Sequence, residues 1–253
     1  MKIFSVCGIT KSGKTTTIEG IIAELVRRGY RVGSVKEIHN EGFQIDPNPA
    51  SNTRRHRAAG ASLVCARGLF ETDFLYPEKL DMDKILSHYE GEYDFVVLEG
   101  VNDIPVPTIV TAHGLEDLRE KWSDMVFAVS GRIAHVKDSL KGTPYSGTPA
   151  ISALEDIQKL VDLVELNVYE RLPNFSPKCC TACGCTCATL GSAILRGEKK
   201  RGDCVADRGV QLKIGGKTIK LVPFVQDILR GTVLGVVREL EGYKAGEEIE
   251  ITF

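Results

Sequence analysis

The 253-residue sequence has almost no net charge, few aromatic residues and no long apolar run. Its 32 Lys and Arg residues nearly balance 34 Asp and Glu residues, which leaves a formal net charge of -2 and no electrostatic case for a dedicated nucleic-acid binder. No apolar run reaches the about 18 residues of a membrane span, and the N-terminus lacks a signal-peptide layout. We therefore expect a cytoplasmic globular protein without nucleic-acid or membrane partners.

Cysteine is abundant and unevenly placed. Six of the eight cysteines fall in one short segment: Cys179, Cys180, Cys183, Cys185, Cys187 and Cys204. A secreted disulfide scaffold would distribute its cysteines and carry an export signal, so this clustering favours metal or redox chemistry. Cys7 and Cys65 stand alone in apolar stretches, and we expect both to be small buried side chains on strands.

The first half of the sequence alternates strand-like and helix-like segments. Strands are predicted over 2–7, 30–35, 61–66, 95–98 and 125–129, and helices over 15–29 and 152–165. The second helix starts with a capping box, Ser152 followed by Glu155. Continuous apolar strand runs are typical of strands buried on both faces, which predicts a mostly parallel sheet flanked by helices.

The pattern changes after about Pro173, where a proline-containing linker leads into the cysteine segment. Beyond it we predict a helix over 188–197, a hairpin of 210–214 and 218–222 around a two-glycine turn, a helix over 225–240 and a strand over 248–253. The sequence therefore predicts two domains, 1–174 and 175–253, the second a small α+β metal-binding domain.

The segment Gly8–Thr15 matches the phosphate-loop pattern G-x-x-x-x-G-K-[ST], between an apolar strand and an amphipathic helix. Its glycines let backbone N–H groups surround a phosphate, and the helix N-terminus adds its positive end. Lys14 would bridge the outer phosphates, and the Thr15 hydroxyl would help to coordinate Mg²⁺. The predicted nucleotide-binding residues are Gly8, Lys11, Ser12, Gly13, Lys14, Thr15 and Thr16. The fold class is thus an α/β P-loop NTPase.

A carboxylate should complete this site. Glu99 ends the apolar run 95–98, at the strand end where ligands sit in open α/β sheets, and could hold Mg²⁺ or orient the attacking water. Lys14 and Glu99 are therefore the catalytic candidates, whereas Asp94 lies at the wrong end of the strand. Ser130-Gly131-Arg132 occupies a plausible base-contact position, but the sequence leaves GTP against ATP open.

Several stretches together resemble the molybdopterin-guanine dinucleotide biosynthesis protein B (MobB) family over roughly residues 1–170. The first is the phosphate loop, and the second is Arg31–Lys36 leading to His39 and Asp46, which is similar to the family's Lys-His-x-His…Asp stretch. The third is Arg55–Ala61, which is similar to an Arg-x-x-Gly-Ala helix start. The fourth is Leu98–Gly100 with Pro107 and Ile109, which is similar to Val-Glu-Gly…Pro-x-Ile. The sequence departs from the family at Glu37, where a His is usual, at 48–52, where a lysine is lost, and at Asn102.

The resemblance implies GTP and Mg²⁺ binding with slow hydrolysis, in the delivery or modification of a molybdenum or tungsten pterin cofactor. It also implies a cofactor-assembly or target enzyme as partner, and a homodimer. Carried over by position, Lys36, His39, Asp46 and Arg57 are candidates for a second anionic site holding a molybdopterin-type ligand. Alternatively, Arg54, Arg55 and Arg57 form a solvated helix face.

The cysteine spacing Cys180-x2-Cys183-x3-Cys187-x16-Cys204 has three close ligands and one distant ligand, as in small four-cysteine [4Fe–4S] domains, which it resembles. Zinc is the alternative, although a second CxxC pair is missing, and redox thiols are a third reading. Cys179 and Cys185 are spare and could replace a neighbour.

Three functions remain open from sequence. The first is a GTP-dependent accessory protein for pterin-cofactor assembly with a cluster-bearing C-terminal domain. The second is a metallochaperone-type NTPase that matures another iron–sulfur or nickel enzyme. The third is a non-catalytic nucleotide-binding module switched by a redox cluster.

Overall fold

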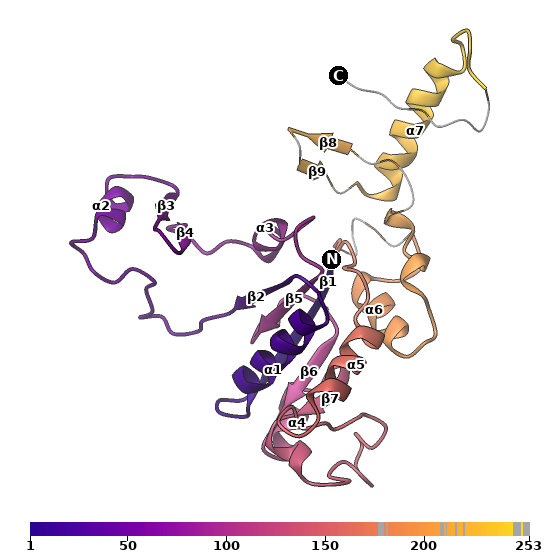
Figure 1. The fold of residues 1–253 in the computed structure, drawn as a ribbon. Coiled ribbons are helices and arrows are strands. Elements are labelled where there is room, and N and C mark those ends of the chain that lie inside the picture. The colour runs from indigo at the N-terminus through magenta and orange to yellow at the C-terminus, as the bar shows by residue number, and fades with distance from the viewer. Residues whose placement is uncertain are drawn as a thin grey trace.

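A five-stranded parallel sheet forms the centre of the protein in the computed structural model (Figure 1). The structure describes residues 1–176, 180, 182–207, 210, 212–215, 217–219, 221–244 and 249. The strands are β1 (Lys2–Gly8), β2 (Val32–Lys36), β5 (Phe95–Glu99), β6 (Thr108–Thr111) and β7 (Val126–Ser130), in the order β2-β5-β1-β6-β7. The predicted parallel α/β sheet is confirmed, but β6, the neighbour of β1, was not predicted as a strand.

Helices cover both faces of this sheet. On one face α1 (Lys14–Arg27) and α5 (Ile157–Asn167) pack on a core that includes Phe4 and Val6 of β1. On the other face α3 (Met82–Ser87) and α4 (Leu115–Lys121) pack near Ile3 and Cys7. Successive β1 side chains thus enter opposite cores, which explains the continuous apolar run. Cys7 is buried as predicted, and burial raises the pKa of its thiol to about 11.

The α5 helix begins later than its sequence pattern predicts. Asp156 is the N-cap, and its carboxylate accepts a hydrogen bond from the Lys159 amide. The predicted capping box at Ser152 and Glu155 is therefore wrong. Ser152 is buried and its hydroxyl lies 3.3 Å from His135 Nδ1, while Glu155 pairs with the same ring nitrogen at 2.7 Å. These tertiary contacts use the two side chains that a local cap would have needed.

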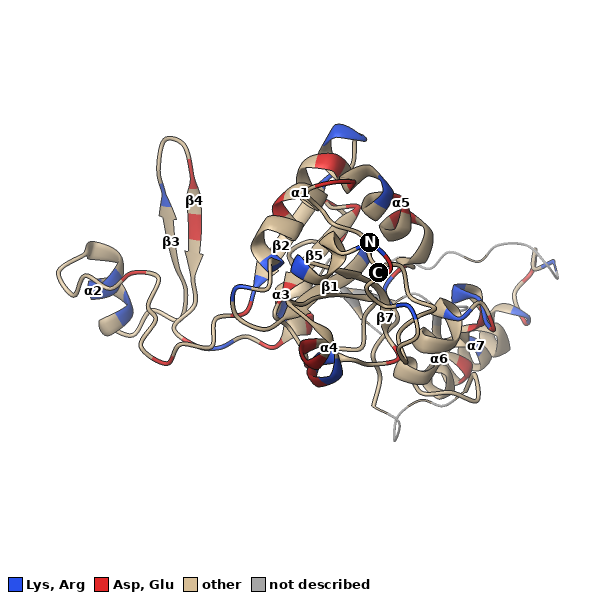
Figure 2. Ribbon diagram, turned by 90° about the horizontal axis from the view of Figure 1, so that it is seen from below, with Lys and Arg blue, Asp and Glu red and all other residues tan. Residues whose placement is uncertain are grey.

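An arm made of residues 37–81 leaves the sheet after β2 and carries α2 (Asn52–Ala58) and a hairpin of β3 (Val64–Arg67) and β4 (Thr72–Leu75) (Figure 1). The strand predicted over 61–66 therefore belongs to an antiparallel hairpin outside the main sheet, and α2 ends where the family pattern suggested a helix start. Figure 2 shows the arm apart from α1 and the sheet, with basic residues on α2 and acidic residues on and just before β4.

The hairpin overturns one prediction about cysteine. Cys65 lies on β3 as expected, but its side chain is exposed. Val64 is buried in the same strand, so the alternation of a two-stranded ribbon decides which side chain is covered. The expectation of a buried Cys65 assumed a sheet covered on both faces.

The C-terminal part contains α6 (Cys187–Leu195), a short hairpin of β8 (Leu212–Ile214) and β9 (Lys217–Ile219), and α7 (Pro223–Val237). It packs against the earlier chain where Arg201 donates hydrogen bonds of 2.7 Å to the Glu170 and Arg171 carbonyl oxygens. The predicted strand 248–253 lies outside the described residues except for Ile249, which is in neither helix nor strand. Within the described chain, no helix is long and apolar enough to cross a membrane.

Candidate functional site

The phosphate loop, Gly8–Thr15, leaves the carboxyl end of β1 and leads into α1. Gly8 has a φ of 154°, and a Cβ there would lie 2.2 Å from the Thr111 carbonyl oxygen. Gly13 caps α1 with a φ of 106°. Both positions require glycine, Gly8 because of the close backbone approach and Gly13 because of its backbone conformation. The motif therefore has the strand–loop–helix context that the sequence predicted.

Ser12 supports this loop from inside. Its side chain is fully buried, and its hydroxyl lies 2.8 Å from the Ile9 carbonyl oxygen and 2.7 Å from Thr111 Oγ1. The Thr111 hydroxyl also donates a 3.2 Å hydrogen bond to the Cys7 carbonyl oxygen. The Ser12 side chain is thus placed to hold the loop's shape, whereas Lys11 and Thr16 are exposed at its surface.

Lys14 is folded back onto its own loop. Its ammonium donates to the Gly8 carbonyl oxygen at 3.0 Å and to the Ile9 carbonyl oxygen at 2.6 Å. Desolvation by burial lowers the pKa of Lys14, and the charge of Glu99 partly opposes this effect. The ammonium thus lies beside the loop where a phosphate would bind, held by neutral carbonyl groups that a phosphate could replace.

Glu99 faces the loop from the end of β5. Its Oε1 accepts a 3.2 Å hydrogen bond from the Thr15 hydroxyl and a 2.9 Å contact from Lys36 Nζ. A hydroxyl and a carboxylate oxygen are hard donors of the kind that Mg²⁺ prefers. The pair Thr15 and Glu99 therefore fits a magnesium site next to the phosphate loop.

The four residues suggested for a second anionic site do not gather in one place. Lys36 contacts Glu99. His39 lies beside Gly100, because a Cβ added to Gly100 would be 3.9 Å from His39 Nε2. Asp46 and Arg57 instead pair with each other at 3.1 Å on the arm. Hydrogen bonds from Thr53 and Ser51, and then from Arg57, lower the pKa of Asp46. The structure therefore joins Lys36 and His39 to the nucleotide site and leaves the other two apart.

A second loop braces the phosphate loop from the end of β7. Gly131 has a φ of 79°, and a Cβ there would lie 2.3 Å from the Ser12 carbonyl oxygen. The segment Ser130-Gly131-Arg132, predicted as a base contact, thus touches the phosphate loop through its glycine. Sequence reasoning missed this role and that of Thr111. The only local signal for Thr111 was the short apolar run after Pro107, at the end of which it stands.

Four of the cysteines belong to one hydrophobic cluster in the C-terminal part. Cys183, Cys185, Cys187 and the buried Cys204 pack with residues that include Leu190, whereas Cys180 is half-buried outside this cluster. Within the described part of the chain, no three His, Cys, Asp or Glu side chains form a group that could hold a metal ion. Three of the four predicted ligands, Cys183, Cys187 and Cys204, thus lie in this cluster without forming a closed site. Cys179 lies outside the described residues.

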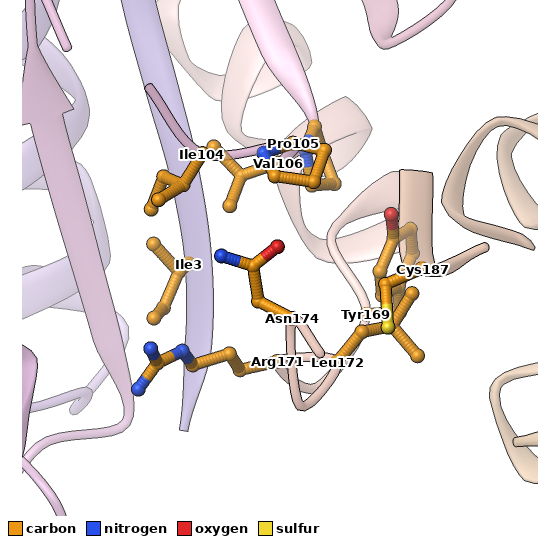
Figure 3. Close-up of a pocket in the computed structure, with 10 residues that line it drawn as sticks. Ile3, Ile104, Pro105, Val106, Tyr169, Arg171, Leu172, Asn174 and Cys187 are labelled. Carbon is orange, nitrogen blue, oxygen red and sulfur yellow. The ribbon is translucent and has the colours of Figure 1, made fainter. Parts of the chain in front are cut away.

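A pocket lies between this cluster and the start of the sheet (Figure 3). Its lining joins Ile3, at the start of β1, to Tyr169 and Cys187, and Asn174 points into it. Ile3 is at the opposite end of β1 from the phosphate loop, so this pocket is not part of the candidate nucleotide site.

Comparisons with known proteins agree with this geometry. A sequence model of the family "Molybdopterin guanine dinucleotide synthesis protein B" matches residues 3–130. A putative molybdopterin-guanine dinucleotide biosynthesis adapter protein of Methanocaldococcus jannaschii is 27% identical over 99% of this chain and 97% of its own length. A probable adapter protein of the same description from Bacillus subtilis is 27% identical over 60% of this chain and 85% of its own. The crystal structure of Bacillus subtilis MobB covers 68% of this chain and all of that chain, with 26% identity and a TM-score of 0.54.

Proposed function

The chain belongs to the family of molybdopterin guanine dinucleotide synthesis protein B, and from this premise we propose that it is a GTP-binding accessory protein. Its task would be the biosynthesis or delivery of the guanine dinucleotide form of a molybdenum or tungsten pterin cofactor. The observation that supports this best is the convergence of Lys14, Thr15 and Glu99 at the carboxyl edge of the sheet. Both relatives described above are named as adapter proteins of molybdopterin-guanine dinucleotide biosynthesis.

In this proposal the chain's own groups bind and orient the nucleotide. Lys14 exchanges its two carbonyl partners for the outer phosphates, and Thr15 and Glu99 supply oxygen donors to Mg²⁺. Bound there, Mg²⁺ would supply positive charge that offsets the charge of the phosphates. In this proposal Glu99 would also orient the attacking water. The sequence offers no recognisable arginine finger for the transition state, so the protein would be at most a weak GTPase.

Nucleotide titration tests the proposal. The chain should bind GTP in preference to ATP in the presence of Mg²⁺, and Lys14→Ala should weaken binding at least about tenfold, because a charge-assisted phosphate contact is lost. Lys159→Ala is the matched control, since Lys159 is an exposed lysine in the first turn of α5. A chain that binds neither nucleotide, or two variants that behave alike, would contradict the nucleotide site.

A molybdopterin-type ligand would bind next to the nucleotide. Lys36 and His39 support this position because they stand at the same edge of the sheet as Glu99 and can contact an anion. Asp46 and Arg57 would join them only if the arm moved or a second copy supplied them. Pterin analysis of the purified protein, before and after Lys36→Ala, tests this ligand: we expect pterin only in the unaltered chain.

The C-terminal region, proposed as a separate domain from residue 175, would hold a [4Fe–4S] cluster on Cys180, Cys183, Cys187 and Cys204. Three of these four share the hydrophobic cluster, where the apolar surroundings would exclude water. Zinc on the same thiolates is the alternative. The cluster-bearing C-terminal domain would dock to, or sense, the partner, a cofactor-assembly or target enzyme.

We also propose a homodimer formed through the arm. Its hairpin tip carries Leu69 and Phe70, which are 94% and 99% exposed, and Phe74 on β4 is 62% exposed. Adjacent exposed apolar side chains on a projecting ribbon favour pairing with another copy of the chain. Sedimentation of the unaltered chain and of a Leu69→Ser, Phe70→Ser variant tests this: the variant should be monomeric at concentrations where the unaltered chain is a dimer.

A further inference from the structure

Lys36 lies beside Glu99 at the candidate nucleotide site. The parallel register places Lys36, the last residue of β2, next to Glu99, the last residue of β5. Lys36 Nζ lies 2.9 Å from Glu99 Oε1, and this same oxygen accepts the Thr15 hydrogen bond at 3.2 Å. The ammonium therefore contacts the carboxylate oxygen that, with Thr15, would coordinate the divalent cation.

The surroundings of this ion pair make an exchange feasible. The Glu99 side chain is only 15% exposed, so it is held at the site, whereas Lys36 is 58% exposed on a flexible four-carbon stem. Once a divalent cation is on Glu99, an ammonium within about 4 Å of it is repelled. The outermost phosphate of a bound triphosphate, which would share that cation, is an anion that could take the displaced ammonium.

We propose that Lys36 exchanges between two partners: the Glu99 carboxylate in the nucleotide-free protein and the outermost phosphate of a bound nucleoside triphosphate. The exchange makes Lys36 a specificity-determining residue for triphosphate over diphosphate. A diphosphate lacks the terminal phosphate that would receive the ammonium, so Lys36 stays on Glu99 and competes with the cation. This inference rests on the proposed nucleotide site.

The structure supplies a matched control for this exchange. Glu37 is the residue that follows Lys36 in the chain, and Lys79 Nζ pairs with Glu37 Oε1 at 2.7 Å. Lys79 is 78% exposed. The Lys79–Glu37 pair resembles the Lys36–Glu99 pair in chemistry and exposure, but Glu37 is not a candidate ligand of the cation. Lys79→Gln therefore removes one ammonium near the site without changing the proposed exchange.

The experiment measures binding of a slowly hydrolysed GTP analogue and of GDP over a range of Mg²⁺ concentrations. In Lys36→Gln we expect the Mg²⁺ concentration for half-maximal GDP binding to fall about threefold, because a competing ion pair is removed. The preference for the triphosphate should fall about tenfold, because a charge-assisted phosphate contact is lost. Lys79→Gln should match the unaltered chain in both measurements, and Lys36→Arg should retain the triphosphate preference. Thermal unfolding of each variant verifies that it is folded.

Two results would overturn the inference. Lys36→Gln could weaken GDP and GTP-analogue binding equally, which would make Lys36 an ordinary phosphate contact. It could also behave like Lys79→Gln while the unaltered chain binds nucleotide normally, which would refute the exchange and leave the proposed function intact. Failure of the unaltered chain to bind either nucleotide would instead refute the proposed function together with the inference.

Discussion

The Thr15 hydroxyl donates a 3.2 Å hydrogen bond to Glu99 Oε1, although the two residues are 84 positions apart in the sequence. The phosphate loop places Thr15 at the start of α1, and the end of β5 places Glu99 opposite it. This contact brings a hydroxyl and a carboxylate oxygen together beside the loop. It is the geometry on which the nucleotide and magnesium proposals depend.

Glu99→Gln tests the contribution of this carboxylate. The amide can still accept the Thr15 hydrogen bond, but it lacks the charge that favours a divalent cation. We expect Mg²⁺-dependent affinity for GTP to fall about tenfold or more, measured by titration at several Mg²⁺ concentrations. Asp94→Asn is the control, because Asp94 precedes β5 at the opposite edge and accepts a hydrogen bond from the Arg31 amide. Equal effects of the two substitutions would contradict the assigned role of Glu99.

Gly131→Ala tests the brace between the loop after β7 and the phosphate loop. The new Cβ would lie 2.3 Å from the Ser12 carbonyl oxygen, so one of the two backbones must move. Gly142→Ala is the control, because Gly142 has a similar φ of 75° and a Cβ added there would meet no atom within 4 Å. Backbone strain alone should cost each variant about 1–3 kcal/mol in free energy of unfolding. Only Gly131→Ala should also lose nucleotide binding, and retained binding there would show that the brace is dispensable.

Metal analysis tests the cysteine segment. Protein isolated without oxygen should contain about four irons per chain and absorb visible light. Cys187→Ser should lose most of the iron, whereas Cys65→Ser should retain it, because Cys65 is exposed on the distant arm. Cys185 lies in the hydrophobic cluster and Cys180 outside it, so either could be the remaining ligand. The iron content of Cys180→Ser and of Cys185→Ser shows which of the two residues binds the cluster. A colourless protein with one zinc per chain would overturn the iron–sulfur proposal.

Acid titration tests the ion pairs of Glu24 with Arg27 and Arg28 at the C-terminal end of α1. Hydrogen bonds from Arg27 and then Arg28 lower the pKa of Glu24 from its ordinary 4.5 to about 2. The folded protein thus binds this proton less tightly than the unfolded chain, so the stabilisation is complete above pH 4.5 and is lost as the pH falls toward 2. At pH 7 the Glu24→Gln variant should have a lower free energy of unfolding than the unaltered chain. Between pH 4.5 and 2 its free energy of unfolding should fall less than that of the unaltered chain, as measured by chemical unfolding. Glu19→Gln, an exposed position on the same helix, should follow the unaltered chain.

Local patterns predicted the main elements of the fold. The phosphate loop, α1, β5 and β7 depend on short-range signals, namely glycine spacing and apolar periodicity, and the structure has them near the predicted places. Helix α6 and the β8–β9 hairpin were also predicted. The errors came where tertiary contacts replaced local ones. Ser152 and Glu155 contact His135 instead of capping α5, and the strand 61–66 pairs with a neighbour that had no clear alternating pattern.

The sequence by itself determined the start of α1 and the side chains beside the loop, because Gly13 acts through its local backbone conformation and Lys14 and Thr15 follow it directly. Only the tertiary structure decided which distant groups join them. Parallel register places Lys36 beside Glu99, and the strand order places Thr111 against Ser12. The path of the arm, in turn, pairs Asp46 with Arg57 away from the loop. Such contacts depend on strand order and chain path, which the periodicity of one segment does not encode.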